Sequence, residues 1–170
     1  MDVASFERRV DDIWAPGSIE NSSLDEIERQ TAAAFGLDQA ALTALMDDAW
    51  SEYVGTLNQE VADYFVRLRT DYKTGILSNS FVGAREREQA AHRFGDMCDV
   101  IVYSHEEGYL KPELGSTASC AIGSAWLPKR RSSLDDVQQN VDGARAAGMN
   151  AITFIDNRQG IAELHALLIG

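Results

Sequence analysis

The chain has 170 residues, of which 45% are hydrophobic, and it carries 27 acidic against 15 basic side chains, for a net charge of −12. This length suits one domain with an appendage, and the hydrophobic fraction is typical of a globular protein with a sizeable core. The negative charge disfavours nucleic acid and anionic membrane surfaces as partners, because both carry phosphates. The sequence has no apolar run of membrane-spanning length and no secretory signal pattern after Met1, so we expect a soluble cytoplasmic protein.

Helical patterns occupy the first 70 residues, which hold 14 acidic and 5 basic side chains and therefore most of the acidic excess. Ser23 and Glu26 have the spacing of a capping box, in which Ser23 accepts a bond from a backbone amide and Glu26 reaches back. Gly36 ends this pattern, and Asp38 precedes the next one as an N-cap. Apolar residues at three- and four-residue spacing predict four helices here, around residues 6–13, 24–35, 39–49 and 57–68.

From residue 73 onward, short apolar runs alternate with helical patterns. This alternation predicts parallel β-α-β units and an α/β sheet that helices cover on both faces. Chemistry in such sheets collects at the carboxyl ends of the strands, which here are Ser78-Asn79, Ser104-His105 and, if Leu134 ends a strand, Asp135-Asp136. The expected strands lie at residues 73–79, 100–103 and 151–155, and the expected helices at 84–94, 137–149 and 161–169.

Three short motifs in this second part carry polar residues suited to chemistry. Ser78-Asn79 follows an apolar strand, Lys111 precedes Pro112, and Asp135-Asp136 opens a helix that carries Asn140 one turn further on. Taken singly, each motif has an ordinary structural explanation. The first is typical of a strand-ending turn, the second of a solvated lysine, and the third of a helix N-cap with a first-turn acid.

Taken together and in this order, the three motifs resemble those of the haloacid dehalogenase-like (HAD) hydrolase superfamily, in the branch with a small helical cap. They are also similar to the phosphatase lobe of bifunctional epoxide hydrolases. The resemblance covers residues 57–113 and 134–170. It implies an α/β fold with a HAD-like Rossmannoid three-layer core and a small helical cap. The implied division is a cap-type segment at residues 1–56 and a partial core at residues 57–170.

The resemblance also implies a role for each matched residue. Ser78, with Asn79 beside it, would hold phosphoryl oxygens, and Lys111 would offset the negative charge of the phosphoryl group. Asp135 and Asp136 would hold Mg²⁺, a cation that prefers oxygen ligands. The implied activity is that of a magnesium-dependent phosphatase acting on a small phosphorylated molecule. A haloacid dehalogenase is less favoured, because that chemistry needs no metal and leaves the acidic pair without a role.

The sequence departs from the family pattern at its first motif. Family members carry an Asp-x-Asp after their first strand, which supplies the nucleophile and a general acid or base. No Asp-x-Asp occurs in this sequence, and no apolar strand precedes residue 20. We therefore expect a chain that begins inside or just before the cap, lacks the first strand of the core, and is inactive as it stands.

A second departure lies at residues 114–133, where the family has a helix and a buried strand. This stretch has no helical period and contains Lys129-Arg130-Arg131 where the strand is expected. It is a polar loop, a basic anion-binding patch, or the product of a compensated frameshift in the gene. The frameshift is our preferred hypothesis, because a one-base shift permits a helix, a loop and a strand that lead into Leu134.

Two other interpretations of the whole chain remain open at this stage. The absent nucleophile favours a non-catalytic ligand-binding or protein-interaction module on a HAD-like fold, with an acidic helical half suited to a basic partner. The missing central strand also allows a degraded gene product without a stable fold. The sequence leaves a homodimer open as well.

Overall fold

The structure is a computed structural model that describes residues 2–19, 22–112 and 131–169. The chain divides into two compact units that alternate along the sequence. The helical unit comprises residues 1–57, 79–93 and 103–108, and the sheet unit comprises residues 58–78, 94–102 and 109–170.

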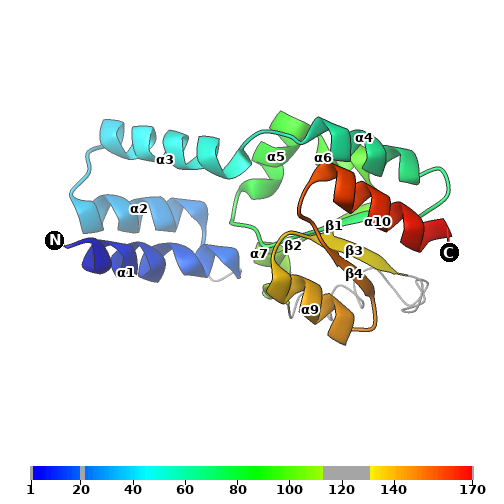
Figure 1. Cartoon of the computed structure of the whole chain (residues 1–170). Helices are drawn as coiled ribbons and strands as arrows, with labels where there is room; N and C mark the ends of the chain where they lie inside the picture. The colour runs from blue at the N-terminus through cyan, green and yellow to red at the C-terminus, as the bar shows by residue number, and fades with distance from the viewer. Residues whose placement is uncertain (1, 20–21, 113–130, 170) are drawn as a thin grey trace. The chain divides into compact units, whose positions relative to one another are not determined.

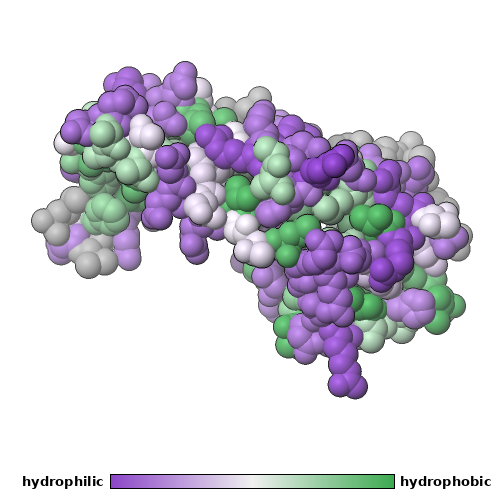
Figure 2. All heavy atoms as spheres, turned by 90° about the horizontal axis from the view of Figure 1, so that it is seen from above, coloured by the Kyte–Doolittle hydropathy of each residue, from purple (hydrophilic) through white to green (hydrophobic). Residues whose placement is uncertain are grey.

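Three helices lie side by side in the helical unit and follow one another in sequence (Figure 1). They are α1 (Val3–Trp14), which a short 3-10 turn at Ala15–Ser18 follows, α2 (Leu24–Phe35) and α3 (Gln39–Val54). The caps predicted at Ser23 and Asp38 are confirmed: each side chain accepts a bond from the backbone amide three residues on, at 3.3 Å and 2.8 Å. In Figure 2, where these helices lie at the left, hydrophilic side chains cover much of the visible surface of this unit.

One detail of the predicted capping box is wrong. The Glu26 carboxylate does not reach back to the start of α2 but binds Arg29, at 2.6 Å and 2.8 Å, and Gln30 on the next turn. The hydrogen bonds from the Arg29 guanidinium and, to a smaller extent, from Gln30 lower the pKa of Glu26 to about 2. A long basic side chain three residues ahead on the same helix face is a stronger partner for a carboxylate than a neutral amide.

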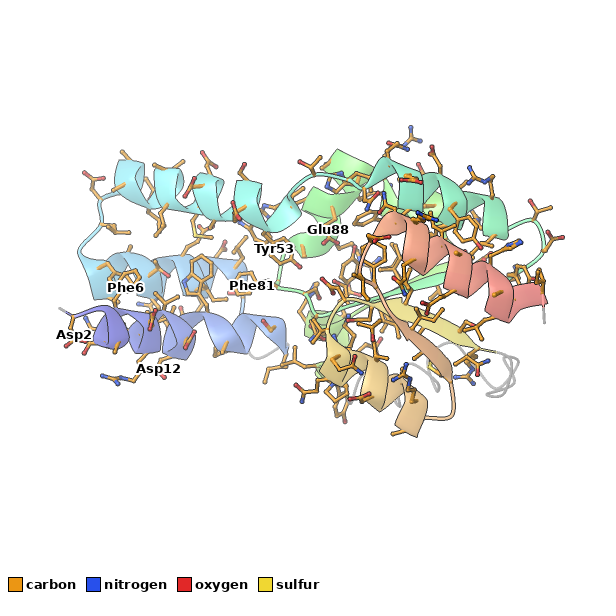
Figure 3. The ribbon with its side chains drawn as sticks, viewed as in Figure 1. Asp2, Phe6, Asp12, Tyr53, Phe81 and Glu88 are labelled. Carbon is orange, nitrogen blue, oxygen red and sulfur yellow. The ribbon has the colours of Figure 1, made fainter. Side chains whose placement is uncertain are left out.

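The core of the helical unit also takes in the chain after residue 79. Phe81 and Ala84, the latter at the start of α5 (Ala84–His92), pack among the buried apolar side chains of the helices. The centroids of the stacked Phe81 and Trp14 rings are 5.5 Å apart. Asp12, by contrast, points outward from α1, away from this core (Figure 3). The residues of this core are Ile13, Ile27, Leu42, Met46, Trp50, Phe81 and Ala84.

The sheet unit contains two pairs of short strands with their flanking helices. β1 (Gly75–Ser78) pairs with β2 (Val100–Tyr103), whose last residue belongs to the helical unit. β3 (Ser132–Asp135) pairs in parallel with β4 (Asn150–Thr153), in a register that sets Asp135 opposite Thr153. The helices of this unit are α4 (Gln59–Leu68), α6 (Phe94–Met97), α9 (Gln138–Ala146) and α10 (Asn157–Ile169), while α7 (Ser104–Glu107) lies in the helical unit.

Helices cover both faces of the β3–β4 pair, as the alternation of strands and helices predicts. α9 and α10 each contact both strands and lie on opposite faces of them (Figure 1). Val141 and Ala144 of α9 pack against Ala151 on one face. On the other face, Gly160 of α10 is so close to the Phe154 ring that an added Cβ would lie 2.6 Å from it. These layers form the α/β core on which the candidate site is built.

Several element boundaries differ from those expected, and two of the differences have a clear local cause. The helix predicted at residues 84–94 ends at His92, because Arg93 takes the left-handed conformation with φ 59°. The last helix begins at Asn157 rather than Ile161, since the Asp156 carboxylate caps the amide of Gln159 at 2.8 Å.

A separate observation concerns the end of the aberrant segment, residues 114–133. Ser132 and Ser133, the last two residues of that segment, form the first half of β3. Residues 114–130 of that segment lie outside the described residues, so the frameshift stays a hypothesis. None of the described helices is long and apolar enough to span a membrane.

Candidate active site

A partly buried ion pair stands at the carboxyl end of β3. The Lys111 ammonium lies 2.7 Å from Asp135 Oδ2, with the two side chains only 18% and 12% exposed. Asp135 is the last residue of β3, and Lys111 precedes Pro112 as the sequence motif requires. The fold thus brings two of the predicted site residues into direct contact across 24 positions of sequence.

Asp135 accepts two further hydrogen bonds, both from residues of the segment that follows it. Its Oδ1 accepts from the backbone N–H of Val137 at 2.9 Å and from the Asn140 side-chain amide at 3.0 Å. Burial alone raises the pKa of Asp135. The bonds from Lys111, Val137 and Asn140 together lower this pKa by more than burial raises it, so that it lies below its ordinary value. Asp135 is therefore ionised at neutral pH, and Asn140 faces the site as its position one turn into the helix predicts.

The position of Lys111 depends on the contact of Pro112 with α9. Gly143 of α9 lies directly against Pro112, and a Cβ added at Gly143 would overlap the proline ring. α9 also carries Asn140, which binds Asp135. One helix therefore holds both partners of the ion pair in place, through a close contact on one side and a hydrogen bond on the other.

The carboxylates predicted to hold Mg²⁺ fit the ion in donor type. A carboxylate has about four acceptor positions, and donors among the described residues occupy three of those of Asp135, two at Oδ1 and one at Oδ2. The neighbouring Asp136 is exposed. Mg²⁺ commonly takes one or two protein carboxylates and completes its shell with water and substrate phosphate. Within the described ranges, no group of three or more acidic, histidine or cysteine side chains is placed to hold a metal on its own.

The structure places Ser78 and Asn79 on the other strand pair. Ser78 is the half-buried last residue of β1, and Asn79 is the exposed residue that follows it. Both therefore start the loop at the end of β1, as predicted.

A buried polar cluster next to this loop was missed by the sequence interpretation. Ser80, Ser104 and His105 are only 2%, 0% and 8% exposed, and hydrogen bonds join all three. Ser104-His105 stands among the strand ends identified from the sequence, which was a usable signal.

Comparisons with known proteins provide an independent test of the fold. Neither a family model nor a curated protein matches the sequence. Solved structures do match: a HAD-like family hydrolase from Porphyromonas gingivalis superposes with a TM-score of 0.72 and 20% identity over 99% of this chain and 85% of that one.

Two other solved structures give the same picture. A HAD family enzyme from Bacteroides thetaiotaomicron, in its magnesium complex, matches with a TM-score of 0.75 and 19% identity over 89% of this chain and 78% of that one. The L-2-haloacid dehalogenase from Xanthobacter autotrophicus matches with a TM-score of 0.59 and 18% identity over 95% of this chain and 68% of that one. The chain therefore has the HAD-like Rossmannoid α/β fold that its ordered motifs predicted.

Proposed function

We propose that this chain binds a small phosphorylated molecule together with Mg²⁺, in the manner of a HAD-like phosphatase, and does not hydrolyse the ester by itself. The observation that carries this proposal is the partly buried Lys111–Asp135 ion pair at the carboxyl end of β3. In open α/β sheets, ligands bind at this edge. The charge of the pair and its position together suit an anionic ligand with a bound cation.

Each residue has a distinct task in this proposal. Lys111 brings a fixed positive charge to the phosphoryl oxygens, and Asp135 holds the ammonium in place through their 2.7 Å contact. Asp135 and Asp136 would hold Mg²⁺, which when bound supplies further positive charge against the phosphoryl group. Ser78 would donate its hydroxyl to a phosphoryl oxygen, with Asn79 beside it in the loop.

The expected lack of turnover follows from the absent nucleophile. The family resemblance assigns attack on phosphorus to the first residue of an Asp-x-Asp, and the sequence contains none. Lys111 and the asparagines cannot replace it, because an ammonium has no lone pair to donate and an amide is a poor nucleophile. The proposal therefore assigns to the remaining residues the binding and orientation of a phosphate ester and not its cleavage.

A solved relative supports the choice of ligand. The HAD family enzyme from Bacteroides thetaiotaomicron has also been solved with magnesium and inorganic phosphate, at 19% identity to this chain. Inorganic phosphate is therefore a suitable first probe for this protein.

The test is calorimetric titration of the chain with inorganic phosphate, with and without Mg²⁺. We expect phosphate to bind only when Mg²⁺ is present. Asp135→Asn and Lys111→Met should each weaken this binding at least tenfold. Lys73→Met is the matched control, because Lys73 forms its ion pair with Asp99 at the surface, with 70% of its side chain exposed. Phosphate binding that all three variants keep would contradict the proposed site. Steady Mg²⁺-dependent cleavage of p-nitrophenyl phosphate that Asp135→Ala abolishes would contradict the lack of turnover.

The absent Asp-x-Asp also favours a second candidate, a non-catalytic interaction module that uses the fold without its phosphate site. This candidate predicts a stable chain that binds neither phosphate nor Mg²⁺. Thermal unfolding separates both candidates from a degraded gene product, which would show no cooperative transition.

A further inference from the structure

We propose that Ser104 and His105, at the start of α7, are positioning residues that fix the phosphoryl-binding loop at Ser78-Asn79 by clamping the next residue, Ser80. This inference rests on the proposed phosphate-binding function. It assigns a task to the most deeply buried polar cluster of the described chain, which the family motifs do not use.

The Ser104 hydroxyl binds both backbone polar groups of Ser80. It accepts from the Ser80 N–H at 2.8 Å and donates to the Ser80 carbonyl at 3.1 Å. Both serines are almost completely buried, so water cannot replace these bonds. Because buried backbone groups must be paired, the loop conformation at Ser80 depends on this one hydroxyl.

A short contact between Ser80 and the His105 ring completes the cluster. A hydroxyl has a single proton, and that of Ser104 is used on the Ser80 carbonyl. The Ser80 hydroxyl accepts from the His105 backbone N–H at 3.5 Å, and it lies 2.7 Å from His105 Nδ1 and 3.4 Å from Ser104 Oγ. The contact with Nδ1 joins the His105 ring to Ser80, whichever of the two atoms donates. Burial lowers the pKa of His105, which favours a neutral ring.

The charged groups around His105 do not make the pair a nucleophilic dyad. His105 Nε2 lies 3.9 Å from Glu106, whose carboxylate is bound to the Arg85 guanidinium on α5. Ser80 is 2% exposed, so no substrate atom can approach its hydroxyl. A hydroxyl that is buried and fully bonded serves to hold structure rather than to attack a substrate.

The clamp lies where it can control the loop. Ser80 follows β1 by two residues and Ser104 directly follows β2, the strand that pairs with β1. Before the clamp, Ser78 is held by strand pairing; after it, Phe81 is anchored in the core of the helical unit. Ser80 is thus the fixed point directly after Ser78-Asn79, and its release would free the loop to which the proposed function assigns the phosphoryl oxygens.

The test compares Ser104→Ala with Thr31→Val. Thr31 is a matched control, because its hydroxyl is equally buried in the same unit, accepts from Trp14 at 3.0 Å and donates to Ile27 at 2.7 Å. For the full chain we measure amide exchange at Ser80 and calorimetric affinity for inorganic phosphate with Mg²⁺. We expect Ser104→Ala to speed exchange at Ser80 and to weaken phosphate binding at least tenfold, while Thr31→Val changes neither.

A second pair of variants keeps the proposal testable if Ser104→Ala fails to fold. His105→Asn places an amide oxygen near the position of Nδ1 and should retain phosphate affinity within about threefold, whereas His105→Ala should lose it. Equal loss in Thr31→Val and Ser104→Ala, or unchanged affinity in Ser104→Ala despite faster exchange at Ser80, overturns the positioning role. A wild-type chain with a protected Ser80 amide but no phosphate binding overturns the proposed function and, with it, the task of the clamp.

Discussion

Lys111 Nζ and Asp135 Oδ2 are 2.7 Å apart, and the same Asp135 carboxylate binds the backbone amide of Val137 and the side chain of Asn140. One partly buried acid thus organises a lysine from a distant segment and the first turn of α9. Removing it leaves three donors without their acceptor, which is more costly than removing any one donor.

We expect Asp135→Ala to lower the free energy of unfolding by about 3 kcal/mol at pH 7, since it strands a partly buried ammonium. Lys111→Met should cost less, about 1–2 kcal/mol, because two amide donors still bind Asp135. Urea denaturation measures both. The control is Asp142→Ala, whose pair with Arg145 has side chains 62% and 52% exposed and should change stability by no more than about 0.5 kcal/mol. Equal losses in Asp135→Ala and Asp142→Ala would contradict this assignment.

Gly143→Ala tests the contact between α9 and Pro112. Helix propensity alone favours alanine at this interior position by about 1 kcal/mol. The overlap of the new Cβ with Pro112 opposes this gain, and we expect a net loss of about 1–3 kcal/mol with weaker phosphate binding, because Lys111 moves with Pro112.

Gly148→Ala is the control for that variant. Gly148 has φ +82° and no atom within 4 Å of an added Cβ, so alanine there strains the backbone by about 1–2 kcal/mol without reaching the site. A stabilised Gly143→Ala variant with unchanged phosphate affinity would show that α9 does not position Lys111.

The buried His105 makes stability depend on pH. Burial, with a smaller contribution from Arg85, lowers the pKa of His105 below 6.5, while Glu86, Glu88 and Glu106 oppose the shift. In the unfolded chain the ring takes up a proton near pH 6.5, where the folded chain does not. Stability from this group is therefore complete above about pH 6.5 and is lost as the pH falls from there toward the lower folded pKa, by at most about 1.4 kcal/mol per pH unit.

His105→Asn removes the titrating ring and keeps an acceptor for Ser80. Urea denaturation between pH 5 and pH 8 should therefore show a smaller acid-side loss in this variant than in the wild type. The other two histidines are present in both proteins and cancel in the comparison. Identical slopes in the two proteins would show that His105 is protonated equally in the folded and unfolded chains.

The helix caps provide a test that does not involve the site. Ser23→Ala and Asp38→Ala should each reduce stability by about 1 kcal/mol, because each leaves the first turn of its helix with an unpaired amide. Glu26→Ala should cost less than Ser23→Ala, since Glu26 binds Arg29 on the helix surface instead of closing a capping box. Thermal unfolding in 0.5 M salt sharpens the contrast, because salt screens the Glu26–Arg29 pair and leaves the Ser23 cap intact. A larger loss of stability in Glu26→Ala than in Ser23→Ala would indicate that Glu26 does close a capping box.

Much of the local structure could be predicted from the sequence. The caps at Ser23 and Asp38, the strand at residues 100–103 and the alternation after residue 73 depend on neighbours within a few positions. Exceptions arise where a partner elsewhere in the chain decides. Ser132 and Ser133 form a strand because β4 supplies their backbone hydrogen bonds, whatever the polarity of their side chains.

For the candidate site, the sequence by itself determined the residue types, their order and their places at strand ends, because motif spacing and strand patterns are local. It also determined that no Asp-x-Asp is present. Only the tertiary structure decided that Asp135 rather than Asp136 binds Lys111, that Gly143 supports Pro112, and that Ser104 clamps Ser80. Each of these contacts joins residues 24 or more positions apart, and the first also depends on which of two adjacent carboxylates turns inward. Neither property is local, because packing and the pairing of buried polar groups in the folded chain decide them.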